Sequence, residues 1–242
     1  MTTTTENNTD LVKQSSASPE QALELALNSK YLEDLQAALP QGMDSESWIR
    51  AMVGILKARP DVMKCDKQSI ILAVFDAART GIDPSSGGAE MFYFLPVGGQ
   101  VSFTLSYKGS IALAKRNGAL LDMYARSIRA GDEWEWTQGG AENITHTPSL
   151  DPERETREIT HVYAVAVLPS STEWCGPLTL YECWSRARIN AHIIKHVKNA
   201  NSAKSPWKAD FEAMAHKTVI KSYFTKGRIP TIPPNNKTWK YK

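Results

Sequence analysis

The fold class of this chain is indicated most clearly by the stretch His161-Val162-Tyr163-Ala164-Val165-Ala166-Val167-Leu168. Its side chains alternate, so that Tyr163, Val165 and Val167 fall on one face of an extended strand and two alanines fall on the other. Small residues on one face are typical of a strand that packs against helices. Because helical patterns precede and follow this strand, the sequence predicts an α+β fold with helices packed on an antiparallel sheet.

Further alternating segments predict additional strands. Residues 92–105 alternate around Pro96-Val97-Gly98-Gly99, which has the composition of a hairpin turn. Strands are also predicted at residues 121–129 and 134–137, with a long loop over residues 139–158. Together these strands supply the expected sheet.

Helical periodicity dominates the first third of the chain. Apolar residues recur at helical spacing over residues 19–39 and again over residues 45–58, where Pro60 stops the pattern. A third helix is predicted over residues 67–80, ended by Gly81 in a left-handed cap. The sequence therefore predicts a helical N-terminal region.

The rest of the chain carries three more predicted helices. Residues 107–117 form a short one, and Thr179-Leu180-Tyr181-Glu182 has the form of a capping box that starts a helix running toward Val197. The last strong helix is predicted to begin with Ser205 as its N-cap and Pro206 at its first position.

The net charge of +2 hides a segregation of charge along the chain. Residues 1–48 contain eight acidic and two basic residues, a net charge of −6, whereas residues 181–242 contain thirteen basic and three acidic residues, a net charge of +10. A basic quarter is a candidate surface for a polyanion. Basic helices are equally common as solvated faces, so charge alone leaves both interpretations open.

Cysteine and hydropathy patterns exclude several protein classes. Cys65, Cys175 and Cys183 are odd in number and lack paired spacing, which argues against a disulfide framework and an all-cysteine zinc site. The chain has no run of about eighteen apolar residues, and its beginning lacks the basic and apolar regions of a signal peptide. We therefore expect a soluble, unexported protein in a reducing compartment.

The tripeptide Tyr107-Lys108-Gly109 follows a predicted strand and has the composition of a nucleic-acid contact. A lysine neutralises a phosphate, a ring stacks on a base, and a glycine allows close backbone approach. Tyr107 fits a buried helical face equally well. Lys108 and Lys115 lie seven residues apart on one side of the helix, where a phosphate role is favoured.

Lys217 and Lys221 lie one turn apart on the last predicted helix, beside an apolar face that includes Trp207. A rigid helix holds such cations firmly, which makes this pair the leading candidate for phosphate contacts. The alternative is a solvated helix edge.

Two other pairs in the strand region are ambiguous. Arg126 and Arg129 fall on opposite faces of a regular strand, so at least one of them is expected to be a bystander. Trp134 and Trp136 share one face of a short acidic strand, where core packing is favoured over base stacking.

Enzymatic chemistry has little support in the sequence. His192 and His196 have the spacing of a metal clamp but lack the glutamate of the zinc-protease motif, and no phosphate-binding glycine loop occurs. A magnesium nuclease needs converging carboxylates, and candidates such as Asp76, Asp83 and Glu90 would have to meet in space.

The order of these motifs resembles the RecT family of phage single-strand annealing proteins. The resemblance covers roughly residues 70–224 and rests on six ordered pieces. They are Ser69-Ile70 to Gly81-Ile82, Tyr107-Lys108-Gly109 to Asn117-Gly118, Ala130-Gly131-Asp132, His146-Thr147-Pro148, Tyr163-Ala164-Val165-Ala166, and Met214-Ala215-His216-Lys217-Thr218-Val219-Ile220-Lys221. The chain departs from the usual family pattern after Thr225.

The resemblance implies a β-β-β-α core with a positively charged groove for single-stranded DNA. It implies an oligomer, ring or filament, that pairs complementary strands without ATP and without a catalytic residue, cofactor or resident metal, although Mg²⁺ could accompany the DNA. The implied setting is the cytoplasm of a bacterial host, with a phage exonuclease as partner and contact with the host single-strand binding protein in doubt. By similarity, the DNA-binding residues are Tyr107, Lys108, Lys115, Arg116, Arg126, Arg129, Arg188, Lys217 and Lys221.

The expected organisation has four parts. A disordered tail over residues 1–18 precedes a helical region over residues 19–65 that contacts neighbouring subunits, a DNA-binding core over residues 66–224, and a flexible basic tail over residues 225–242. Two other functions remain open at this point. A passive coat protein binds single strands without speeding their pairing, and a magnesium-dependent nuclease shortens them.

Overall fold

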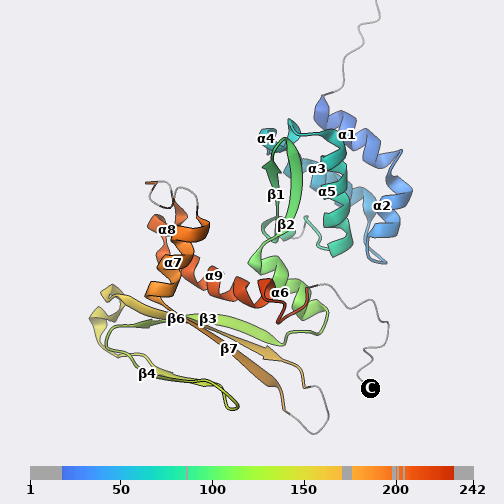
Figure 1. Cartoon of the computed structure of the whole chain (residues 1–242). Coiled ribbons are helices and arrows are strands. Elements are labelled where there is room, and N and C mark those ends of the chain that lie inside the picture. Colours follow the sequence, from blue (N-terminus) through green and yellow to red (C-terminus); the bar gives the residue numbers. More distant parts are fainter. Residues whose placement is uncertain are drawn as a thin grey trace, which may run out of the picture. The chain divides into compact units, whose positions relative to one another are not determined.

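The computed structural model describes residues 18–85, 87–170, 176–197, 200, 202–203 and 205–231. Residues 1–17 of the tail predicted over residues 1–18, Cys175 and most of the predicted C-terminal tail lie outside this part, whereas Ser18 caps the first helix. The chain divides into two compact units (Figure 1). Unit 1 comprises Met1–Ala89 and Tyr93–Thr104, and unit 2 comprises Glu90–Phe92 and Leu105–Lys242.

Unit 1 consists of short helices and a two-stranded hairpin. Asp44 and Asp66 accept hydrogen bonds from backbone N–H groups in the first turns of α3 and α5. Gly81 ends α5 at a φ of 62°, which confirms the predicted left-handed cap. The elements are α1 (Pro19–Asn28), α2 (Leu32–Ala38), α3 (Ser45–Lys57), α4 (Pro60–Met63), α5 (Lys67–Thr80), β1 (Phe92–Val97) and β2 (Gln100–Leu105), with the 3₁₀ turn η1 (Gly88–Glu90) before β1.

The core of unit 1 is formed by apolar faces of these helices. Leu27, Leu35 and Trp48 are almost completely buried, and the Trp48 indole donates a hydrogen bond to the Ile82 carbonyl at 3.0 Å. The single helix predicted over residues 19–39 was wrong. It breaks after α1, where the Ser29 hydroxyl bonds back to the Leu25 carbonyl at 2.6 Å. Serine side chains compete in this way with the helical ladder.

Unit 2 is built on a three-stranded antiparallel sheet with strand order β3-β6-β7. The strands are β3 (Asp122–Arg129), β6 (Ile159–Leu168) and β7 (Leu178–Ser185), and β4 (Glu133–Thr137) pairs with β5 (Asn143–Thr147) in a separate hairpin. The helices are α6 (Tyr107–Arg116), α7 (Arg186–His196), α8 (Pro206–Ala209) and α9 (Phe211–Thr225), and the 3₁₀ turn η2 (Pro152–Thr156) precedes β6.

The alternation along β6 places different layers on the two faces of the sheet (Figure 1). Ala164 and Ala166 face the helical layer and pack with Val219 and Tyr223 of α9 in the main core. Tyr163 and its neighbours pack in a second cluster on the other face, toward the β4–β5 hairpin. This arrangement confirms the predicted α+β fold with helices packed on an antiparallel sheet.

The helix predicted from Thr179 was wrong, because this segment is β7. Trp184 is buried in the helix-side core, while Tyr181 and Cys183 pack against the cluster on the opposite face. A capping box is a local signal of about 1 kcal/mol, and it loses to a ladder with β6 together with burial of an indole. The helix begins later, where the Ser185 side chain accepts from the Arg188 N–H.

Two further predictions needed correction. The predicted loop over residues 139–158 contains β5 and η2; β5 has one apolar residue, Ile144, so its alternating pattern is weak. The last helix is broken into α8 and α9, because Asp210 accepts from the Ala213 N–H and caps a new helix start. In the described part of the chain, no helix has the length and apolar character needed to cross a membrane.

Candidate nucleic-acid interface

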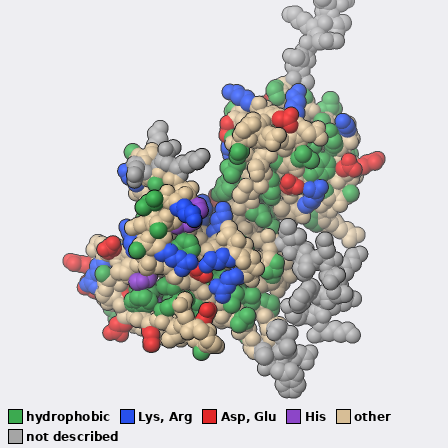
Figure 2. Space-filling view, in the orientation of Figure 1, with side chains coloured by type: hydrophobic (Ala, Val, Ile, Leu, Met, Phe, Trp, Pro, Cys, Tyr) green, Lys and Arg blue, Asp and Glu red, His purple; other side chains and the backbone are tan. Residues whose placement is uncertain are grey.

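A pocket of about 380 Å³ lies between α7 and α9 in unit 2. Its walls combine aromatic rings with basic side chains. Figure 2 shows Lys and Arg side chains gathered on this unit where α7 and α9 lie, with histidine beside them. The lining residues are Trp184, His192, His196, Val197, Trp207, Met214, Lys217, Thr218, Lys221, Ser222 and Thr225.

The α9 helix positions the two lysines of the pocket. Its inner face is anchored by Val219 and Tyr223, and the Tyr223 hydroxyl donates to carbonyls of both β6 and β7, at 2.7 and 3.0 Å. Lys217 and Lys221 lie one turn apart and both line the pocket. The sheet therefore holds the helix that carries these cations.

The α7 helix contributes two histidines to the same pocket. The rings of His192 and His196 lie 4.6 Å apart between centroids, and His192 also meets the Trp184 ring edge-on at 5.6 Å. Burial, with the charge of His196, holds the pKa of His192 below its ordinary value. This shift disfavours the charged form of His192, so we assign the phosphate contacts of the pocket to Lys217 and Lys221.

Arg188 lies next to this pocket on α7. Its guanidinium is 4.2 Å from the centre of the Trp184 ring, in a cation–π contact. Of the predicted contacts, Arg188, Lys217 and Lys221 are brought together around one pocket wall. Trp184 and the two histidines belong to the same site, and the sequence prediction had not assigned them to DNA.

The predicted contacts on α6 form a second basic group. Tyr107 packs half-buried against the main core, which agrees with its predicted buried alternative. Lys108 pairs with Glu90 at 2.7 Å and Lys115 pairs with Asp122 at 2.8 Å, all with exposed side chains, while Arg116 is exposed at the end of the helix. Surface pairs of this kind are weak, so a phosphate can replace the carboxylate.

Gly109 allows close approach of another part of the same chain, whereas the sequence predicted that it allows close approach of a nucleic acid. A Cβ atom at this position would collide with the Met91 carbonyl oxygen. The N–H of Ser106, the N-cap of α6, donates to the same carbonyl at 2.8 Å. The glycine allows close approach of the chain's own backbone, and that approach anchors the start of α6.

Arg126 and Arg129 lie on opposite faces of β3, as the pleat predicts. Arg126 is exposed on the face opposite α9, with its guanidinium 5.2 Å from the Tyr124 ring. Arg129 is 8% exposed, and its guanidinium bonds to Glu212 of α9 at 2.6 Å and to the Arg157 carbonyl at 2.9 Å. Arg129 is thus engaged inside unit 2 and does not join the pocket.

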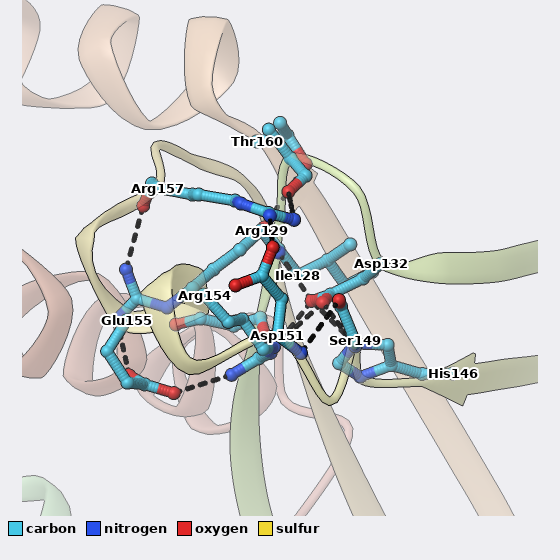
Figure 3. A network of polar contacts seen from close by, with 12 residues as sticks. Ile128, Arg129, Asp132, His146, Ser149, Asp151, Arg154, Glu155, Arg157 and Thr160 are labelled. Atoms are coloured by element: carbon cyan, nitrogen blue, oxygen red, sulfur yellow. Dashed lines mark hydrogen bonds and ion pairs between the residues drawn. The ribbon is translucent and has the colours of Figure 1, made fainter.

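The loop contacts around Arg129 belong to a buried polar network (Figure 3). Its centre is the Asp132 carboxylate, which accepts from Arg154, from the backbone N–H groups of Arg129 and Ser149, and from His146. The hydrogen bonds from Arg154 hold the pKa of Asp132 far below its ordinary range. Two of the six sequence pieces, around Asp132 and His146, meet here.

The tryptophans of β4 pack on the sheet. The Trp134 ring lies 4.4 Å from the His161 ring, and Trp136 meets Tyr181 edge-on at 6.4 Å. Both rings contact side chains of the sheet, but Trp134 is 38% exposed, so the predicted core packing does not hold for this residue.

The groups considered for enzymatic chemistry have other partners. Asp76 pairs with Arg79, Asp83 accepts from Ser85, and Glu90 pairs with Lys108. Among the described residues, no three His, Cys, Asp or Glu side chains converge as metal ligands. Burial raises the pKa of the Cys183 thiol to about 11, so this thiol is a poor nucleophile at neutral pH.

Comparison with known proteins gives a consistent result. The sequence pattern of the RecT family matches residues 46–229. The chain is 32% identical over 200 residues to Protein RecT of Escherichia coli (strain K12), a match that covers 79% of this chain and 70% of that protein. It is 26% identical over 193 residues to uncharacterized protein YqaK of Bacillus subtilis (strain 168), covering 79% of this chain and 62% of that protein.

Proposed function

This chain belongs to the RecT family, and from that premise we propose that it coats single-stranded DNA as an oligomer and anneals it to a complementary strand without ATP. Family membership supports DNA binding, DNA recombination and single-strand annealing as its general role. The finer statements, on ATP, coating and assembly, are proposals. So is the expectation that an exonuclease supplies the single strands.

The observation that carries the proposal is the pocket between α7 and α9. Lys217 and Lys221 come from a helix that is anchored to two strands through Tyr223, so their positions are defined before DNA arrives. Such cations can neutralise backbone phosphates. Neutralisation also lowers the repulsion between two incoming strands, which is the electrostatic requirement for annealing.

The aromatic residues of the pocket shape its wall and do not read bases. Trp184 and Trp207 line the pocket but are largely buried, so they shape its wall around the lysines. Phosphate contacts give affinity without sequence readout, which leaves base edges open for pairing. The α6 lysines extend the basic surface of unit 2 and are proposed as secondary contacts.

The test is the pairing of two complementary fluorescent oligonucleotides with the purified protein, without ATP. Wild type is compared with Lys217→Gln/Lys221→Gln and with a charge-matched control, Lys57→Gln/Lys64→Gln, whose lysines are exposed in unit 1. We expect faster pairing with wild type and control, and a clear loss with the pocket variant.

Other outcomes identify the alternatives. Tight binding that slows pairing would replace annealing with the passive coat function. Shortening of the labelled strands that depends on Mg²⁺ would indicate a nuclease. Equal rates of pairing with the two double variants would contradict the proposed role of the pocket lysines.

A further inference from the structure

One buried carboxylate beside the pocket holds three basic side chains. Glu182 of β7 is 8% exposed. Lys226 Nζ lies 2.6 Å from its Oε1 and Arg188 Nη2 lies 3.2 Å from the same oxygen, while Arg228 Nη1 lies 3.5 Å from Oε2. We call these four residues the Glu182 cluster.

The Glu182 cluster is connected to the pocket through Trp184. Glu182 Oε1 accepts the Trp184 indole N–H at 2.7 Å, and the Trp184 ring lines the pocket that also contains Lys217 and Lys221. Arg188 lies over the same ring. The cluster therefore lies next to the pocket that carries the lysine pair, and the two share the largely buried Trp184 ring.

The charge of the cluster is unbalanced. Burial disfavours the charged carboxylate, but hydrogen bonds from Lys226 and Trp184 outweigh it and keep the pKa of Glu182 below its ordinary value. Three cations against one carboxylate leave an excess of two positive charges. The basic side chains keep substantial access to solvent, with exposed fractions of 50% for Arg188, 44% for Lys226 and 30% for Arg228.

The geometry is that of a prepared anion site. A guanidinium carries five N–H donors and an ammonium three, so one carboxylate cannot occupy the donors of all three side chains. The carboxylate also keeps three mutually repelling cations at one place before an anion arrives. An excess of oriented donors next to two lysines fits a phosphate diester.

We propose that Arg188, Lys226 and Arg228, positioned by Glu182, bind a backbone phosphate of the same strand that contacts Lys217 and Lys221. This rests on the proposed function and names a second phosphate site for it. Lys226 and Arg228 were not among the contacts predicted from the sequence. Glu182 is a positioning residue in this proposal, since it touches the cations and not the DNA.

The first experiment measures oligothymidine affinity as a function of salt. Wild type is compared with Lys226→Gln/Arg228→Gln and with the control Lys57→Gln/Lys64→Gln. The slope of log K against log salt is negative, and each lost phosphate contact makes it less steep by about 0.7 on single strands. We expect the slope of the cluster variant to be less steep by about 0.7 to 1.4 and that of the control to be unchanged.

The slope distinguishes the second phosphate site from the proposed annealing function. A cluster variant with the wild-type slope would overturn the second phosphate site, while the proposed function would stand as long as wild type binds and anneals. Wild type that binds no oligothymidine would overturn both. Partial unfolding of a variant lowers the concentration of active protein but does not change the salt dependence of binding by the folded molecules. Unfolding curves give the folded fraction of each variant.

Glu182→Gln tests the positioning role by the sign of its effect. Glutamine preserves an acceptor for the Trp184 N–H but removes the negative charge. Simple electrostatics predicts tighter DNA binding after this change. Positioning predicts weaker binding, by about three- to tenfold, the contribution of one hydrogen bond. Tighter binding with an unchanged slope would overturn the role assigned to Glu182.

Discussion

The Asp132 carboxylate and the Arg154 guanidinium form a bidentate pair although the residues stand 22 positions apart. Both contacts, Nε to Oδ1 and Nη2 to Oδ2, measure 2.7 Å, and the carboxylate is fully buried. The pair joins the turn after β3 to η2, which lies just before β6 (Figure 3). The pair therefore ties the end of β3 to the segment that leads into β6.

Replacing Asp132 by Asn should strongly destabilise unit 2. The change removes the buried carboxylate that pairs with Arg154, which is 15% exposed, and leaves only the exposed Glu155 as its counter-charge. Breaking a buried pair costs roughly 3–5 kcal/mol. Urea unfolding followed by tryptophan fluorescence measures the loss. Asp122→Asn, which removes one partner of the exposed pair with Lys115, serves as the control and should have no measurable effect. Equal effects of the two changes would contradict the assigned role of the network.

Gly109→Ala should destabilise the protein even though alanine is the better helix former. The added Cβ would collide with the Met91 carbonyl oxygen, which forces a backbone shift. Gly54→Ala is the matched control, because Gly54 lies in α3 and a Cβ added there would meet no atom of another element within 4 Å. That change should stabilise unit 1 by about 0.5–1 kcal/mol. Thermal unfolding curves measure the effects of the two substitutions. A stabilising effect of Gly109→Ala would contradict the close contact between Gly109 and the Met91 carbonyl.

Lys217→Gln/Lys221→Gln should reduce the salt dependence of single-strand binding. The slope of log K against log salt is negative, and two lost phosphate contacts make it less steep by about 1.4. Fluorescence anisotropy of a labelled oligonucleotide at several salt concentrations gives this slope. A weaker affinity with the slope of wild type would mean that the lysines act on the fold and not on phosphates.

Stability should decrease as the pH falls from about 7 to 5. Burial holds the pKa of His216 below its ordinary value near 6.5, although Glu212 acts in the opposite direction. Below the unfolded pKa, the unfolded chain binds a proton more readily than the folded chain does. The contribution of His216 to the free energy of unfolding is therefore fully present above the unfolded pKa and is lost as the pH falls below it. His161 and His192 are shifted in the same direction by burial and add to the slope.

The measurement is the free energy of unfolding in urea at a series of pH values. His216→Gln should flatten the dependence, because the group that binds the proton has been removed. A glutamine can still bond to the Ser127 hydroxyl, which lies 2.8 Å from His216 Nε2. An unchanged pH dependence in this variant would exclude His216 as a source.

Local signals in the sequence were sufficient for most of the elements. Alternation along Tyr163 to Val167 predicts both faces of the central strand, and Gly81 predicts the end of a helix. Lys217 and Lys221 could be paired from their spacing alone, and both line the pocket. Periodicity and caps depend on neighbours within one or two turns, and these are visible in a linear sequence.

Two of the failures are local, at Ser29 and Asp210, and the others involve partners that are distant in the chain. The capping box at Thr179 is locally sound, yet β6 recruits that segment into the sheet. Arg129 has the composition of a DNA contact, yet Glu212 of α9 and the Arg157 carbonyl engage it. The sequence assigned Glu182 only to that capping box, because its three cationic partners are brought to it by the tertiary structure.

The fold class, the order of most elements and the lysine pair could thus be predicted from local patterns, since periodic burial and charge are properties of short segments. Tertiary contacts select which cations remain at the surface and which form ion pairs inside the fold. That choice depends on whether a carboxylate from another element comes within about 4 Å, a distance that no local pattern encodes.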